Sequence, residues 1–216
     1  MKNHRWRWTR SWKKISLLVL FAIVVVMSCS FFAFQYLFSK NYVSGPSMQP
    51  NFNNGDHVIA LRNASISRGD VVIMKAPDKK NSLYIKRVIG LPGDKIKSQE
   101  NGFFINGKKY EQKFFDPNSK LREKLYTPYA GMPYTYTYIF SIESLAQTPD
   151  WQKRYSKKYL KVLQKQNRVP EHNYFVLGDH RTVSNDSRMF GFVKDSQIVG
   201  RVALKYWPLS DFTFYG

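Results

Sequence analysis

Apolar residues are concentrated in one uncharged run near the start of the chain, from Ile15 to Phe38. About 20 helical residues of this kind cross the roughly 30 Å hydrocarbon core of a bilayer. A cleaved signal peptide has a shorter apolar core and a small-residue cleavage site, and a lipoprotein signal ends at its cysteine. This run continues past Cys29 and through residues 31–34 without such a site. The pattern therefore predicts an uncleaved transmembrane helix over residues 15–38.

After this run the pattern changes to short β-type segments separated by turns. The predicted strands cover residues 57–62, 70–75, 83–89, 103–110, 134–140, 174–177 and 199–207. Asn106-Gly107 between two short runs of strand formers is a strong hairpin signal. We therefore expect a mainly β domain formed by residues 39–110 and 171–216.

Residues 111–170 interrupt the strand pattern with proline-containing turns and then a helical segment, predicted over residues 151–167. We interpret them as an inserted α/irregular subdomain. On a helical wheel one arc holds Trp151, Tyr155, Tyr159, Val162 and Leu163, and the opposite arc holds Lys153, Arg154, Lys157, Lys158, Lys161 and Lys165. Two hypotheses follow. The aromatic stripe packs on the β domain, or the helix lies on a membrane surface with its lysines near anionic headgroups.

The chain is strongly basic, with 34 Lys and Arg against 15 Asp and Glu and a net charge of +19. Basic residues and no acidic ones precede the apolar run. The positive-inside rule therefore predicts a cytoplasmic tail at residues 1–14 and places the rest of the chain outside. Such an excess of positive charge implies an anionic neighbour. Because a membrane span is present, we expect membrane lipid rather than nucleic acid.

The cysteine and the histidines of the sequence indicate neither a disulfide nor a metal site. The single cysteine, Cys29, lies inside the apolar run, so no internal disulfide can form. The histidines, at 4, 57, 172 and 180, lack metal-ligand spacing, and the sequence suggests no metal site.

Ser47 is a candidate nucleophile because it lies between Gly45-Pro46 and Pro50, just after the apolar run. Glycine permits unusual φ angles and each proline restricts its neighbours, so we expect a stiff, exposed corner. A serine in such a turn is common, and a hydroxyl needs an adjacent base before it becomes a good nucleophile.

Lys86 is the candidate base, within the predicted strand 83–89. A lysine acts as a base only when neutral, so its pKa must fall from about 10.4 toward 7–8, which burial can achieve. Neighbouring strand residues point to opposite faces, so we expect one of Lys86 and Arg87 to be buried and the other solvated. The competing interpretation is a surface lysine on an edge strand.

Four blocks occur in order along the chain: Val43 to Pro50, Gly55 to Val58, Tyr84 to Asp94, and Gly178 to Arg188. Together they resemble the motifs of type I signal peptidases, the membrane-bound serine/lysine proteases that remove signal peptides from exported proteins. The resemblance covers roughly residues 40–107 and 172–206. It implies a signal-peptidase-like catalytic β domain behind one transmembrane helix.

The resemblance also implies roles for individual residues. Ser47 matches the nucleophile, Lys86 the general base, and Ser184 the serine that orients the lysine. Residues matching the family's ionic support are Asp179, Arg181, Asp186 and Arg188. Gly45 stands where some members have an oxyanion-binding serine, so the backbone at Gly45 and Ser47 is expected to form the oxyanion hole. His180 stands where the family usually has asparagine.

The implied reaction is cleavage after small residues, at A-x-A type sites, through an acyl-enzyme on Ser47 and without a cofactor. The expected partners are the signal peptides of preproteins and membrane lipid. The expected location is the inner membrane of a bacterial cell, with the catalytic domain on the outer or periplasmic side. Ser47 follows Phe38 by nine residues, a linker of at most about 30 Å, so the nucleophile is expected near the membrane.

Four alternatives stay open on sequence grounds. A self-cleaving SOS repressor shares the Ser/Lys fold, although the transmembrane run argues against it. A processing peptidase specialised for one pilin-like or conjugation substrate fits the same motifs. A serine/histidine enzyme could use His57 or His180. A membrane-anchored basic binding module without enzymatic activity explains the charge but not the four ordered blocks.

Overall fold

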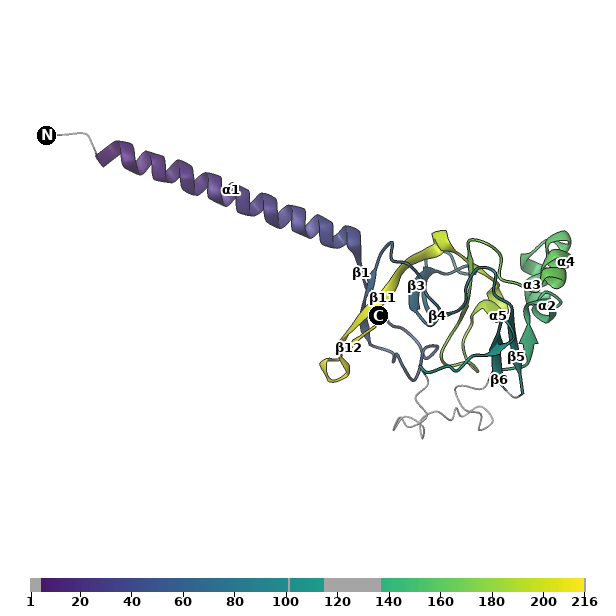
Figure 1. The fold of residues 1–216 in the computed structure, drawn as a ribbon. Helices are drawn as coiled ribbons and strands as arrows, with labels where there is room; N and C mark the ends of the chain where they lie inside the picture. The colour runs from purple at the N-terminus through teal and green to yellow at the C-terminus, as the bar shows by residue number, and fades with distance from the viewer. Residues whose placement is uncertain (1–4, 101, 115–136, 216) are drawn as a thin grey trace. The chain divides into compact units, whose positions relative to one another are not determined.

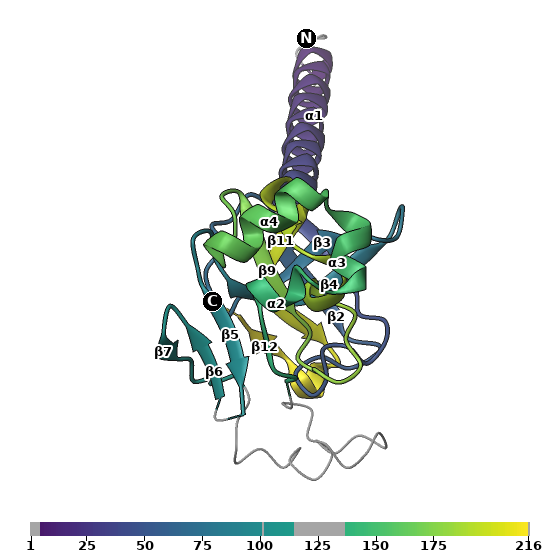
Figure 2. The same cartoon turned by 90° about the vertical axis from the view of Figure 1, so that its right-hand side faces the viewer.

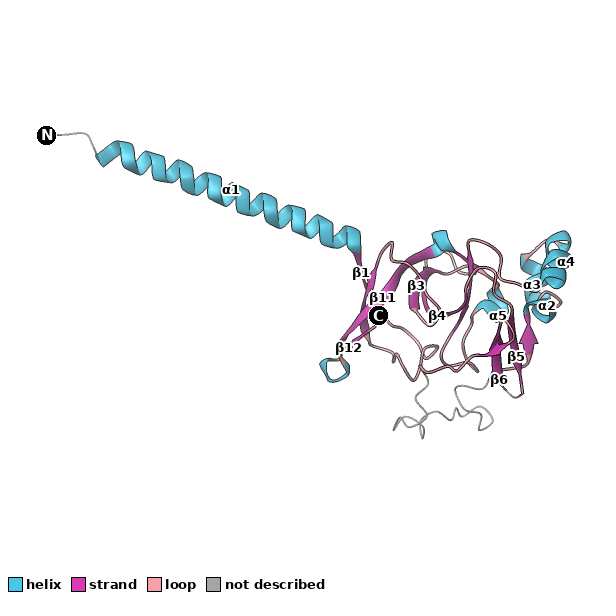
Figure 3. Cartoon of the chain, viewed as in Figure 1, coloured by secondary structure: helices cyan, strands magenta, loops and turns pink. Residues whose placement is uncertain are grey.

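The computed structural model describes residues 5–100, 102–114 and 137–215. It divides into two compact units, Met1–Phe38 and Ser39–Gly216. The first is helical and the second is mainly β, as Figure 3 shows. This confirms the expected fold class of a β-rich domain behind one apolar helix.

Helix α1 spans Arg5–Leu37. Its part from Lys14 to Leu37, with a mean hydropathy of 2.8, is long and apolar enough to cross a membrane. The expected span of residues 15–38 differs from this part by one residue at each end. The helix begins before residue 15, because the basic segment contains no helix breaker and lysine and arginine are good helix formers. It ends at Leu37, and Phe38 is the first residue of β1.

The main sheet of the second unit contains eight strands in the order β1-β2-β11-β3-β4-β9-β10, with β12 beside β11. Their bounds are β1 Phe38–Tyr42, β2 His57–Leu61, β3 Val71–Lys75, β4 Leu83–Gly90, β9 Asn173–Leu177, β10 Val193–Lys194, β11 Ile198–Trp207 and β12 Thr213–Phe214. The central pairs, including β3 with β4 and β4 with β9, are antiparallel. β4 is therefore an inner strand, flanked on both sides, and not the edge strand of the competing interpretation.

A second sheet has the order β7-β6-β5-β8. Its strands are β5 Ile96–Gln99, β6 Gly102–Ile105, β7 Lys108–Lys109 and β8 Phe140–Ser141. The expected hairpin joins β6 and β7, and Asn106 and Gly107 have φ of 53° and 80°, as a primed two-residue turn requires. Of the predicted strand 134–140, residues 134–136 lie outside the described residues and only Phe140 is in a strand. This sheet takes strands from before and after residue 111, the expected start of the insert.

The helices of the second unit are α2 Ile142–Leu145, α3 Pro149–Arg154, α4 Lys157–Gln166 and α5 Ser187–Phe190, with short 3₁₀ turns η2 Asp195–Gln197 and η3 Leu209–Asp211. The expected single helix over 151–167 was wrong, because α3 and α4 are separate. Ser156 caps α4 by accepting a hydrogen bond from the Tyr159 N–H. A serine cap of this kind starts a new helix where the wheel pattern alone continues the old one.

The helices share a core with the β strands. Trp151, Leu160 and Leu163 are buried with Ile96 and Phe175, and Tyr155 and Tyr159 pack against this cluster. In Figures 1 and 2 α2, α3 and α4 group together beside the strands of the second unit. The packing hypothesis for the aromatic stripe is therefore confirmed for these side chains, which are not free to enter a membrane interface. Val162 of the same predicted arc is exposed.

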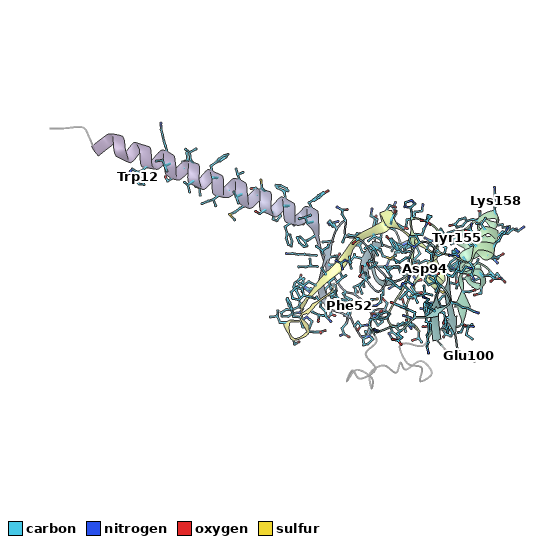
Figure 4. The ribbon with its side chains drawn as sticks, in the orientation of Figure 1. Trp12, Phe52, Asp94, Glu100, Tyr155 and Lys158 are labelled. Carbon is cyan, nitrogen blue, oxygen red and sulfur yellow. The ribbon has the colours of Figure 1, made fainter. Side chains whose placement is uncertain are left out.

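A second cluster lies under the candidate serine corner. Val43, Met48 and Phe52 are buried with Ile73 of β3 and Ile85 of β4. Figure 4 shows Phe52 and Tyr155 on opposite sides of the second unit, so the two clusters are distinct. The serine corner is thus anchored to the same sheet that carries Lys86.

Candidate active site

The structure brings Ser47 and Lys86 into contact. Ser47 lies in the turn that follows β1, and Lys86 lies in the middle of β4. Lys86 Nζ is 2.8 Å from Ser47 Oγ and donates to the carbonyl oxygen of Ile85 at 3.0 Å. A nucleophile and a base within 2.6–3.2 Å of each other form the geometry that activates a serine.

Lys86 has the environment that a lysine base needs. Its side chain is 4% exposed. Burial lowers the pKa of Lys86 to about 8, although the carboxylates of Asp186, Asp179 and Asp78 oppose this effect. Desolvation disfavours the charged ammonium, whereas nearby negative charge favours it. A substantial fraction of Lys86 is therefore neutral at mildly alkaline pH.

The serine corner is held by backbone and side-chain hydrogen bonds. Gly45 has a φ of 89°, a region that favours glycine, and its N–H donates to Asn54 Oδ1 at 3.0 Å. The Phe52 N–H donates to the Met48 carbonyl at 2.9 Å, and the His180 N–H donates to the Ser47 carbonyl at 3.1 Å. These bonds fix the direction of the Ser47 side chain toward β4.

The two expected oxyanion donors differ in their hydrogen bonds, and the role of both stays a prediction. The Gly45 N–H donates to Asn54 Oδ1, so it would have to leave this acceptor to bind an oxyanion. Among the described residues, the Ser47 N–H donates to no backbone carbonyl. Ser47 therefore offers the remaining backbone donor of the expected pair.

His180 and His57, the alternative candidates for the base, make contacts other than with the Ser47 hydroxyl. Nδ1 of His180 is 3.2 Å from the Pro46 carbonyl, which requires the proton on that nitrogen. Burial lowers the pKa of His180, and the Pro46 carbonyl opposes this change. His57 contacts the rings of Tyr42 and Tyr206. The group bonded to the Ser47 hydroxyl is thus Lys86, which does not favour the serine/histidine alternative.

Asp179 is paired with Arg87, a residue outside the expected set. Arg87 Nε and Nη2 donate to the two carboxylate oxygens of Asp179 at 2.8 and 2.6 Å, and Nη1 donates to the Gly69 carbonyl at 2.7 Å. Asn51 Nδ2 also donates to Asp179 at 2.8 Å. The expectation of a solvated neighbour for Lys86 was therefore wrong. Both faces of β4 are buried, and Arg87 pairs with a buried carboxylate.

Asp186 and Arg188 form the second buried ion pair. Arg188 Nε and Nη2 donate to the two carboxylate oxygens, each at 2.8 Å, and the Gly178 N–H donates to Asp186 at 3.0 Å. Burial by itself raises the pKa of Asp186, but the charge and hydrogen bond of Arg188 and the Gly178 N–H together lower it. Asp186 therefore stays ionised and holds the start of α5, whose N-cap it forms.

Arg181 bonds mainly to neutral groups. Its guanidinium donates to the Gly178 carbonyl at 3.0 Å, to Thr137 Oγ1 at 2.8 Å and to Gln112 Oε1. Burial lowers the pKa of Arg181 to about 10, although Asp179 opposes the change. These bonds tie the loop after β9 to Gln112 and Thr137, two residues of the expected insert, so Arg181 is part of the scaffold.

Ser184 lies beside the dyad without the expected bond to Lys86. Its hydroxyl is buried and has no hydrogen-bond partner among the described residues. A Cβ placed on Gly178 would lie 2.1 Å from Ser184 Oγ and 2.5 Å from the Ser47 carbonyl oxygen. The hydroxyl is therefore packed next to the serine corner, and its role in orienting Lys86 stays a prediction.

A cleft of about 490 Å³ opens over Ser47 and Lys86. It is lined by residues 40–47, Ile73, residues 83–86, Val183 and Asn185. The dyad therefore borders a cavity that a substrate can enter. Within the described residues, no group of three His, Cys, Asp or Glu side chains could hold a metal ion.

Comparison with known proteins agrees with this geometry. The family model described as "Signal peptidase, peptidase S26" matches residues 12–207. A signal peptidase IB from Staphylococcus aureus is 31% identical over 93% of this chain and 91% of its own length. A signal peptidase I from Bacillus caldolyticus is 32% identical over 99% of this chain and 95% of its own.

A crystal structure of a signal peptidase I from Enterococcus faecalis is also similar, at 28% identity and a TM-score of 0.46, covering 64% of this chain and 97% of that one. The family match and the relatives span nearly the whole chain, and all of them are signal peptidases. They therefore favour a signal peptidase over a non-enzymatic binding module or a repressor. The chain therefore belongs to the signal peptidase family, peptidase S26, a family of serine proteases that cleaves signal peptides from preproteins at the membrane.

Proposed function

We propose that Ser47 is the nucleophile and Lys86 the general base of this signal peptidase. The observation that carries the proposal is the 2.8 Å contact between Lys86 Nζ and Ser47 Oγ, made by a buried lysine whose pKa is lowered to about 8. A serine and a neutral lysine in contact can perform both proton transfers of peptide hydrolysis.

In the acylation step, Ser47 Oγ attacks the carbonyl carbon of the scissile bond while Lys86 Nζ takes the hydroxyl proton. The negative charge on the carbonyl oxygen is stabilised by the Ser47 N–H. Such a donor acts by being in place before the charge develops. When the carbon–nitrogen bond breaks, the Lys86 ammonium gives its proton to the departing amine, and an ester to Ser47 remains.

In the deacylation step, neutral Lys86 takes a proton from a water molecule, and the resulting hydroxide attacks the ester carbon. The ester bond to Ser47 breaks, and the Ser47 oxygen recovers the proton from Lys86. The signal peptide leaves as a carboxylic acid, which releases its remaining proton to solvent. The same two side chains therefore serve both halves of the reaction, without a cofactor.

The substrate is an extended segment with small residues before the scissile bond. The cleft beside Ser47 is lined in part by Ile73, Ile85 and Val43, and its volume of about 490 Å³ has room for a few peptide residues. Side chains that face these walls must be small and apolar, which fits cleavage after an A-x-A type sequence.

For the membrane arrangement, α1 is the anchor and the basic segment before it lies on the cytoplasmic side. The catalytic domain then lies on the outer face of the inner membrane. A reporter fused after residue 216 and tested for protease access in intact spheroplasts checks this orientation directly.

The proposal is tested with a purified preprotein in detergent. Ser47→Ala and Lys86→Ala each remove one member of the reacting pair, so each variant should lose cleavage while it retains the wild-type unfolding transition. Asn185→Ala, which lines the cleft without belonging to the pair, is the matched control and should keep measurable cleavage. Cleavage within tenfold of wild type in either folded dyad variant contradicts the mechanism.

A further inference from the structure

A second groove of about 490 Å³ adjoins the cleft, and we call it the flanking groove. Its lining residues are Tyr138, Ile139, Phe140, Leu145, Thr148, Asp150, residues 181–185, Arg188 and Met189. Val183 and Asn185 line both hollows, so a single turn of the loop after β9 separates them. A peptide that leaves the cleft past this turn enters the flanking groove without crossing other elements.

We propose that the flanking groove binds the part of the preprotein that follows the scissile bond, and that it favours a large apolar side chain there. The inference rests on the proposed function, because it places the scissile bond at Ser47. It assigns the cleft to residues before that bond and the flanking groove to residues after it.

The direction of the peptide follows from where the dyad lies in the cleft. Residues 40–42 of β1 and Leu83 of β4 line the cleft and precede Ser47 and Lys86 along the chain. Because the apolar walls that suit small side chains, Val43, Ile73 and Ile85, lie in this cleft, we assign the residues before the scissile bond to it. Tyr84 and Lys86 point to the opposite face of β4 from Ile85, and the Tyr84 ring packs toward Phe190, next to Met189 of the flanking groove. The chain beyond the scissile bond therefore continues toward that groove.

The side chains of the flanking groove define what it can bind. Ile139 is 65% exposed and Met189 is 48% exposed, and Leu145 and Phe140 are buried beneath them. The two arginines in the lining are already engaged, because Arg188 pairs with Asp186 and Arg181 bonds to Gly178, Thr137 and Gln112. Exposed aliphatic groups over a buried apolar floor match an apolar side chain rather than an anion.

The reach is short. An extended chain advances about 3.3 to 3.6 Å per residue, and the two hollows share a wall, so the side chain in question belongs to one of the first few residues after the bond. The lining residues 138–150 come from the segment that was expected to be an insert. This segment therefore contributes to substrate choice through the described residues that flank the catalytic loop.

The test uses the full-length enzyme in detergent and a set of fluorogenic peptides. All share the same A-x-A segment before the bond. After it, four peptides carry a single leucine at the second, third, fourth or fifth position among serines, and one carries serines only. Wild type should cleave one of the leucine peptides with a kcat/KM about tenfold or more above the all-serine peptide, the scale set by removing apolar contacts from a pocket.

Ile139→Ser and Met189→Ser should abolish that preference, so that each variant cleaves the favoured leucine peptide and the all-serine peptide with the same kcat/KM. Val162→Ser, an exposed aliphatic residue of α4 outside both hollows, is the matched control and should keep the preference. Equal cleavage of all five peptides by wild type overturns the inference while the proposed function stands, as does a preference that survives both groove variants. Failure of wild type to cleave any of the peptides or a preprotein contradicts the proposed function instead.

Discussion

Arg87 and Asp179 form a bidentate ion pair, with nitrogen–oxygen distances of 2.8 and 2.6 Å, and both residues are buried. Arg87 directly follows Lys86 in β4, and Asp179 directly precedes His180, whose N–H bonds to the Ser47 carbonyl. Asn51, in the turn after Ser47, bonds to the same carboxylate. The pair thus connects the strand of the base, the loop after β9 and the serine corner.

Replacing Arg87 by leucine should therefore cost a large part of the fold's stability. The change leaves the Asp179 charge buried without its partner, which typically destabilises a protein by about 3–5 kcal/mol. The measurement is the free energy of unfolding of the full chain in detergent by denaturant titration. The control is Arg201→Leu, which removes a partly exposed pair with Asp70 at 4.0 Å and should cost at most about 1 kcal/mol. Equal losses in the two variants contradict this account of the buried pair.

Gly178 should tolerate no side chain, because of its contacts with the dyad loop. An added Cβ lies 2.5 Å from the Ser47 carbonyl oxygen, a backbone atom that cannot rotate away. Gly178→Ala should displace the nucleophile by a fraction of an ångström to about 1 Å and lower kcat/KM about 10²-fold.

Gly200→Ala is the matched control, because its Cβ meets the Leu61 carbonyl oxygen at 2.6 Å between β2 and β11. It should reduce the unfolding temperature without lowering kcat/KM of the folded enzyme. Two results would contradict this account. In one, Gly178→Ala lowers the unfolding temperature but not kcat/KM. In the other, Gly200→Ala lowers kcat/KM as much as Gly178→Ala does.

Ser184→Ala should lower kcat/KM without lowering the unfolding temperature. The hydroxyl is buried without a partner among the described residues, so the free enzyme loses no hydrogen bond when it is removed. An ammonium on Lys86 has three N–H donors, and the proposed role of Ser184 is to accept one of them during turnover. Ser184→Thr keeps the hydroxyl and serves as the control. If kcat/KM of Ser184→Ala is unchanged, Ser184 does not orient Lys86. If kcat/KM and the unfolding temperature fall together, the role of Ser184 is structural.

The basic faces of α3 and α4 remain candidates for contact with anionic lipid. Trp151 is packed inward, so any attraction is electrostatic and comes from the exposed lysines. A fragment of residues 40–216 should bind anionic vesicles at low salt and dissociate as salt screens the charges. Binding should weaken when Lys153, Lys157, Lys158 and Lys161 are replaced by glutamine.

The control replaces Lys95, Lys97, Lys108 and Lys109, four exposed lysines in or next to the second sheet, and removes the same charge. Cleavage of a short soluble peptide should be the same in both variants. A fragment that ignores anionic vesicles at low salt, or that loses binding equally in the two variants, excludes a specific lipid contact by these helices.

Much of the fold could be predicted from local patterns. The apolar run, the β strands around residues 57–90 and the Asn106-Gly107 hairpin are all set by neighbouring residues, and the structure has them. The division between α3 and α4 could not be predicted from the hydrophobic periodicity, because it depends on the Ser156 cap. The short strand β5 was not predicted, because its residues form a strand only when β6 and β8 pair with it.

The site was predictable to the extent that it follows known motifs. Ser47 and Lys86 lie far apart in sequence, and their expected pairing came from the family resemblance and not from spacing. Arg87 and Asn54 were missed, because their partners are reached only through tertiary contacts. The one available signal was that strand 83–90 reads as apolar on both faces, which leaves no solvated side for Arg87.

The central claim is that neutral Lys86 removes the proton from Ser47, and the pH dependence of kcat/KM tests it most directly. The pKa of Lys86 is lowered to about 8, and the neutral form is the active one. In the full-length enzyme, kcat/KM for a peptide without titrating groups should rise tenfold per pH unit below about pH 8 and level off above it. The same acidic limb should persist in His180→Gln and disappear with the activity in Lys86→Arg. A limb near pH 6.5, the ordinary value for histidine, that vanishes in His180→Gln would contradict the account.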